Sequence, residues 1–147
     1  MKRKLISILT VCIISVTAHA QSSEIFKTAD GAIRGYDPVS YFKGGTPVKG
    51  KDDFKYTWNG ADWHFSSQNN LDSFMANPDR FAPAFGGYCA YGMAGGHKAP
   101  TDPEAWTIVD GKLYFNYNKQ VLGMWRKDQP GYINKANKNW PAIKDKQ

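Results

Sequence analysis

The chain has 147 residues with a formal net charge of +6, and 41% of them are hydrophobic, which suits one folded domain. Three of the 19 basic residues lie at positions 2–4, and without them the formal charge falls to +3, too weak to favour nucleic acid as a partner. The sequence contains no repeat, no low-complexity tract and no proline-rich linker.

The first 20 residues have the pattern of a secretory signal peptide. A basic start precedes an apolar run over residues 5–16, and Ala18 and Ala20 form a small-x-small cleavage site. The apolar run is short for a permanent membrane span, and no second one follows. We therefore expect cleavage after Ala20. The remaining residues, 21–147, are predicted to be a single exported domain, periplasmic or secreted, with no stable membrane span.

The first half of this domain predicts short strands and helices. Residues 32–34 favour a strand, and residues 39–42 favour a buried strand or one helical turn. Alternating aromatic residues on both sides of Asn59-Gly60 predict a β-hairpin over residues 54–65 with a type I′ turn. A helix is predicted from Ser66 or Ser67 to about Ala76, then another turn over residues 78–81. The side chains expected to face inward from the longer helix are Leu71, Phe74 and Met75.

The second half predicts another hairpin and a helical pair. Residues 106–115 flank Asp110-Gly111, which again favours a type I′ turn. Helices are predicted over residues 118–128 and from Pro130 onward, where Ile133, Ala136 and Trp140 recur on one face. The expected fold class is α+β: small antiparallel hairpins with packed helices and a C-terminal helical pair.

A glycine-rich segment, residues 86–97, has the sequence GGYCAYGMAGGH and carries the most distinctive chemistry. Cys12 would leave with the signal peptide, so Cys89 is an unpaired cysteine in an oxidising compartment. Met93 and His97 follow it at four-residue steps. Thiolate and thioether groups select copper, and imidazole accepts copper or zinc. The segment thus predicts a soft-metal site, copper ahead of zinc, with Cys89, Met93 and His97 as ligands and His64 as a fourth candidate.

Three other interpretations remain open for Cys89. A thiol-dependent enzyme would use it as nucleophile, with Tyr88, Tyr91 or His97 as acid or base. A binding module for a small molecule would line a pocket with the abundant aromatic residues. A structural role would leave the thiol buried and inert. No Cys-x-x-Cys is present, which excludes thioredoxin-type chemistry, and binding is favoured over enzymatic activity.

The segment from Trp63 to Phe81 resembles the YHS domain. Phe65, Phe74, Pro78 and Phe81 occupy the offsets of that family's pattern, and Asp37-Pro38-Val39 matches its opening. The similarity continues through GGYCAYG, DPEAW and DGKLYFNY to Ala136 and Trp140. The chain is therefore similar to the longer, exported branch of the family. This similarity extends over nearly all residues that follow the signal peptide.

This resemblance implies a treble-clef-like core and a role in handling metal. Short YHS domains carry metal-binding cysteines after the Asp-Pro-Val and around the start of the helix. The corresponding residues here are Ser40, Ser66 and Asn70, whose hydroxyl and amide groups are poor substitutes for thiolate. A metal site in this chain would therefore depend on Cys89 instead.

Overall fold

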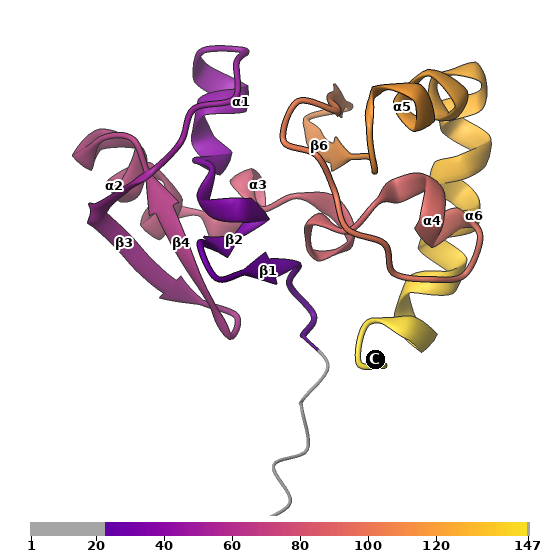
Figure 1. The fold of residues 1–147 in the computed structure, drawn as a ribbon, viewed down its shortest axis with the longest axis horizontal. Coiled ribbons are helices and arrows are strands. Elements are labelled where there is room, and N and C mark those ends of the chain that lie inside the picture. The colour runs from indigo at the N-terminus through magenta and orange to yellow at the C-terminus, as the bar shows by residue number, and fades with distance from the viewer. Residues whose placement is uncertain (1–22, 147) are drawn as a thin grey trace, which may run out of the picture.

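The structure is a computed structural model that describes residues 23–146 (Figure 1). The predicted signal peptide, with Cys12, lies outside the described residues. Within residues 23–146 the chain forms three two-stranded antiparallel sheets with helices packed around them, which confirms the predicted α+β class. No helix in this part of the chain is long and apolar enough to cross a membrane.

The chain starts with a small hairpin, β1 (Lys27–Thr28) and β2 (Gly31–Ala32), followed by the 3-10 turn η1 (Ile33–Gly35). The strand predicted over residues 32–34 is wrong beyond Ala32. Ile33 and Arg34 have positive φ values of 43° and 60°, which are incompatible with an extended strand. Residues 39–42 are helical, within α1 (Pro38–Lys43), because Asp37 caps its first turn.

The predicted aromatic hairpin is formed by β3 (Lys51–Trp58) and β4 (Ala61–Phe65). Asn59 and Gly60 have φ values of 49° and 73°, as a type I′ turn requires. Ser67 caps α2 (Gln68–Ala76), and α3 (Pro78–Phe81) and the 3-10 turn η2 (Ala84–Gly87) follow. Met75 was expected to face inward, but it is 50% exposed, because the buried face of this short helix is filled by Leu71 and Phe74.

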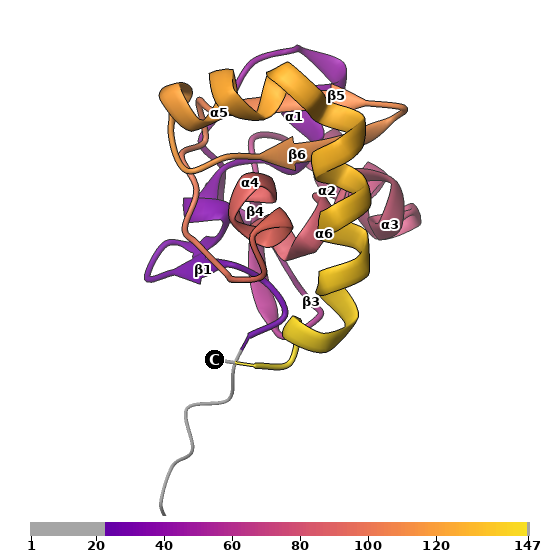
Figure 2. The same ribbon diagram turned by 90° about the vertical axis from the view of Figure 1, so that its right-hand side faces the viewer.

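The second half begins with the short helix α4 (Ala90–Ala94), followed by the hairpin of β5 (Trp106–Val109) and β6 (Lys112–Phe115). The C-terminal helical pair is α5 (Lys119–Trp125), extended by η3 (Arg126–Asp128), and α6 (Gln129–Ile143). The long α6 lies along α4 (Figure 2). These elements confirm the second predicted hairpin and the helical pair.

The core consists of two apolar clusters with β6 between them. One centres on Trp63 and Phe74 in the first half, and the other on Met93 and Trp125 in the second. Successive side chains of a strand point to opposite faces. Leu113 and Phe115 of β6 therefore join the first cluster, whereas Tyr114 between them joins the second. This strand connects the two halves of the molecule that are visible in Figure 1.

Candidate functional site

A fully buried carboxylate, Asp37, organises the start of the first helix. Its Oδ1 accepts hydrogen bonds from the backbone N–H groups of Val39 (2.8 Å) and Ser40 (3.3 Å). Its Oδ2 accepts three more, from the N–H (2.8 Å) and hydroxyl (2.7 Å) of Ser66 and the amide Nδ2 of Asn70 (2.7 Å). The burial of this charge is thus offset by five donors from two segments of the chain.

Three polar residues that the resemblance to short YHS domains singled out, Ser40, Ser66 and Asn70, meet at Asp37. The Ser40 hydroxyl donates to the Asp37 carbonyl oxygen at 2.7 Å, while Ser66 and Asn70 donate to its side chain. Hydrogen bonds therefore join α1, the end of β4 and α2 at this point. Because the donors of Ser66 and Asn70 already serve Asp37, this centre is a closed structural network.

Cys89 lies at the N-terminus of α4 and is 1% exposed. Its Sγ accepts a hydrogen bond from Gly92 N–H at 3.4 Å and donates one to Asn116 Oδ1 at 3.7 Å. The segment that follows α4 covers it, since Cys89 N–H donates to the carbonyl of Ala99 at 3.0 Å. Neither of these hydrogen-bond partners, a backbone N–H and an amide oxygen, is a general base of the kind that a nucleophilic cysteine uses.

Met93 and His97 lie in the same compact turn of chain. Met93 is fully buried one helical turn after Cys89, and its N–H donates to the Cys89 carbonyl at 2.9 Å. His97 is exposed, and its imidazole lies over Gly92, where a Cβ would stand 3.3 Å from Nε2. The absence of a side chain at Gly92 therefore allows the imidazole to approach the same residue whose N–H contacts the Cys89 sulfur.

His64 lies elsewhere, on the outer face of β4. Figure 1 shows β4 and α4 in opposite halves of the molecule. His64 points to the face opposite the fully buried Trp63, and it lines a groove beside β1 and β2. Three of the four predicted ligands thus lie in the one segment around α4, and the fourth lies apart from them.

The two tyrosines considered as acid or base are engaged in packing. The Tyr88 hydroxyl donates to the carbonyl of Ser23 at 2.9 Å, and burial raises the pKa of Tyr88. The ring of Tyr91 lies 5.0 Å from that of Tyr132 on α6, between centroids. Neither tyrosine has a hydrogen bond to Cys89 within residues 23–146.

Asn116 is a site residue that the sequence analysis missed. It is fully buried just after β6, and its Oδ1 accepts from Tyr91 N–H at 3.3 Å as well as from the Cys89 thiol. Within residues 23–146 its Nδ2 has no hydrogen-bond partner, and neither does the buried Nε1 of Trp125. Tyr91 N–H fixes the amide orientation, because the opposite one would place two donors face to face. A polar residue directly after a buried strand was the available signal.

Lys98 ties the segment over Cys89 to both ends of the described chain. Its Nζ donates to the carbonyl oxygens of Ser23 (3.2 Å), Lys144 (2.8 Å) and Lys146 (2.6 Å). Partial burial lowers the pKa of Lys98. The cover of Cys89 is therefore held in place by residues distant from it in sequence.

Comparisons with known proteins identify one segment. Residues 39–85 match the family model of the YHS domain. The match covers about a third of the chain, begins two residues after Asp37 and ends before Cys89. It therefore contains Ser40, Ser66 and Asn70, but neither Asp37 nor the glycine-rich segment beyond Phe85. No curated protein and no solved structure was found to match the chain. Among residues 23–146, no three His, Cys, Asp or Glu side chains gather to form a metal site.

Proposed function

We propose that this is an exported protein of the longer YHS branch that handles a soft metal ion, copper ahead of zinc, in the periplasm or outside the cell. Cys89 is the principal ligand, with Met93 and His97 as its partners. The observation that carries the proposal is their arrangement in one turn of chain. Cys89 and Met93 lie one helical turn apart, both buried, and the His97 imidazole lies against Gly92 between them.

The donor chemistry supports copper over other metals. A thiolate and a thioether are soft ligands that select Cu(I), and imidazole binds it too. Metal binding requires Cys89 to lose the proton with which it hydrogen-bonds Asn116 Oδ1, so loading releases a proton. A set with only one cysteine and one histidine suits Cu(I), whereas structural zinc generally takes four such ligands.

Loading also requires the segment over Cys89 to open. The thiol is 1% exposed, and the hydrogen bond from Cys89 N–H to Ala99 closes the segment over it. The glycines at positions 95 and 96 are both exposed, and Gly96 has a φ of 86°, so they provide a turn from which residues 97–101 can move. His97 lies within this segment and would bring its imidazole with it.

An anaerobic Cu(I) titration against a chromophoric chelator tests the proposal. We expect the wild type to withdraw one equivalent of Cu(I), Cys89→Ser to withdraw none, and Met93→Leu and His97→Ala to bind at least tenfold more weakly. His64→Ala tests the fourth predicted ligand, and its distance from α4 predicts little change. If Cys89→Ser competes for Cu(I) as well as the wild type, the proposal is wrong.

A further inference from the structure

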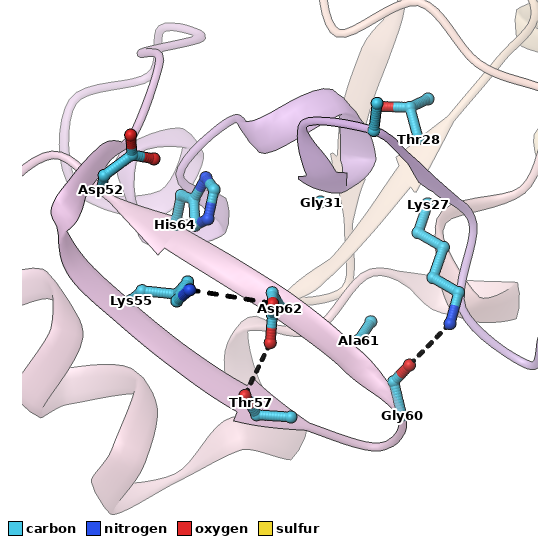
Figure 3. Close-up of a pocket in the computed structure, with 11 residues that line it drawn as sticks. Lys27, Thr28, Gly31, Asp52, Lys55, Thr57, Gly60, Ala61, Asp62 and His64 are labelled. Atoms are coloured by element: carbon cyan, nitrogen blue, oxygen red, sulfur yellow. Dashed lines mark hydrogen bonds and ion pairs between the residues drawn. The ribbon is translucent and has the colours of Figure 1, made fainter.

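A groove of about 630 Å³ lies between the first two hairpins, on the side of β4 away from the core (Figure 3). Two glycines shape it. Gly31, with a φ of 100°, brings β2 against β4, since a Cβ there would stand 2.5 Å from the Asp62 carbonyl oxygen. A side chain at Gly50 would overlap His64. The close approach of both segments places the half-buried His64 where this groove meets a neighbouring hollow of about 510 Å³.

The charged groups in the middle of the groove, Asp62 and Lys55, are already paired with each other. Asp62 accepts a hydrogen bond from the Thr57 hydroxyl at 2.6 Å and forms a 3.9 Å ion pair with Lys55. The Thr57 hydrogen bond, with the positive charge of Lys55, lowers the pKa of Asp62. This carboxylate therefore stays ionised and occupied by its own neighbours.

The two ends of the groove carry unpaired groups of opposite sign. Lys27 of β1 reaches the tip of the β3–β4 hairpin, where its Nζ donates to the carbonyl of Gly60 at 2.8 Å. Its ammonium group has two further N–H donors. Asp52 lies at the other end beside His64 (Figure 3). Within residues 23–146 neither Lys27 nor Asp52 forms an ion pair, and the His64 imidazole makes no hydrogen bond.

The lining also restricts the chemistry of a ligand. It contains no Phe, Tyr or Trp side chain, and alanine is its only apolar residue type besides glycine, which disfavours apolar ligands. From Gly60 to His64 the strand spans roughly 13 Å, at about 3.4 Å per residue. An extended dipeptide of about 7 Å, with a contact of about 3 Å at each end, has that length.

We propose that this groove binds a small zwitterion of dipeptide length, with its carboxylate at Lys27 and its ammonium at Asp52, and with His64 as a further hydrogen-bonding partner. The site is separate from Cys89 and does not depend on metal. It gives the protein a second ligand class, built from charges that the fold leaves unpaired.

A titration of the ¹⁵N-labelled protein with diglycine tests this site. We expect saturable shifts on β1, β4 and Asp52, and none with cyclic diglycine, which has the same peptide groups but no charge. Asp52→Asn and Lys27→Met should each weaken diglycine binding about three- to fivefold, the size expected for a solvent-accessible ion pair. Asp72→Asn on α2 and Lys138→Met on α6 are exposed, charge-matched controls that should leave binding unchanged.

The proposal is overturned if diglycine produces no saturable shifts, if cyclic diglycine binds as well, or if the groove variants behave like their controls. All four substitutions affect exposed side chains, so thermal unfolding should show that each variant remains folded. Copper loading by these variants should match that of the wild type, which separates this test from that of the metal proposal.

Discussion

The two halves of the molecule each contain a buried polar centre at the start of a short helix, and the two centres are completed differently. At the Asp37 centre (Asp37, Ser40, Ser66 and Asn70), a carboxylate that can only accept is surrounded by five donors. At the Cys89 centre (Cys89, Gly92 and Asn116), the contacts to sulfur are 3.4 and 3.7 Å long, and the Asn116 Nδ2 has no partner in the part of the chain that the structure describes.

The comparison distinguishes a centre whose carboxylate accepts five hydrogen bonds from one whose Asn116 amide donor remains unpaired within residues 23–146. The five hydrogen bonds to Asp37 join α1, the end of β4 and α2, and engage both oxygens of the carboxylate. At Cys89 the same role of capping a helix is filled by a weaker group, since sulfur is a poor acceptor. A buried polar group without a partner costs stability, so the Asn116 Nδ2 makes this centre less stable than one with all its groups paired.

The largest effect is expected at the Asp37 centre. Asp37→Asn turns one of the two acceptor oxygens into a donor facing other donors, and should lower the free energy of unfolding by about 2–4 kcal/mol. Chemical denaturation measures this. Asp72→Asn, an exposed change of the same chemistry on α2, should cost far less. Equal losses in the two variants would mean that the five hydrogen bonds contribute little.

A smaller loss is expected at the other centre. Asn116→Ala leaves Tyr91 N–H without its acceptor but also removes the unpaired Nδ2, so we expect a net loss of about 1–2 kcal/mol in denaturant unfolding. Asn134→Ala, at an exposed position of α6, is the matched control and should not destabilise. A loss as large as that of Asp37→Asn would erase the distinction between the centres.

Tyr41 on α1 allows the first half to be tested by pH. Burial raises the pKa of Tyr41 above its usual value near 10, and its hydroxyl donates to the Pro103 carbonyl at 3.0 Å. The folded state therefore keeps this proton while the unfolded state loses it, so stability decreases as pH rises above about 10. Tyr41→Phe should cost about 1 kcal/mol at pH 7 and show a shallower alkaline decline. Parallel pH curves for the two proteins would contradict this.

The smallest effect is expected for the cysteine itself. Cys89→Ser keeps a side chain that can cap α4 and should change stability by less than about 1 kcal/mol, whereas Cys89→Ala loses the cap and costs about 1 kcal/mol. Thermal unfolding of both variants checks this. A serine variant that fails to fold would assign Cys89 a structural role and weaken the case for a ligand.

Local patterns predicted the elements well, and long-range contacts explain what they missed. Asn59-Gly60 and Asp110-Gly111 fixed both hairpins because their backbone preference is local. The role of Asp37 depends on Asn70, 33 residues away, and that of Cys89 on Asn116, 27 residues away. Before the fold is known, Asp37 looks like a turn residue, and Asn116 like the end of a strand.

The hydrogen bonds from Lys98 to the C-terminal end of the described chain have a consequence for the order of folding. All four residues of the Asp37 centre lie between positions 37 and 70, so they are present before the C-terminal half of the chain has been synthesised. In contrast, the segment that covers Cys89 is held by hydrogen bonds from Lys98 to the carbonyls of Lys144 and Lys146. In addition, α4 packs against α6. The Cys89 thiol is therefore buried only after α6 has folded against α4. Before that step the thiol is accessible to metal ions and oxidants.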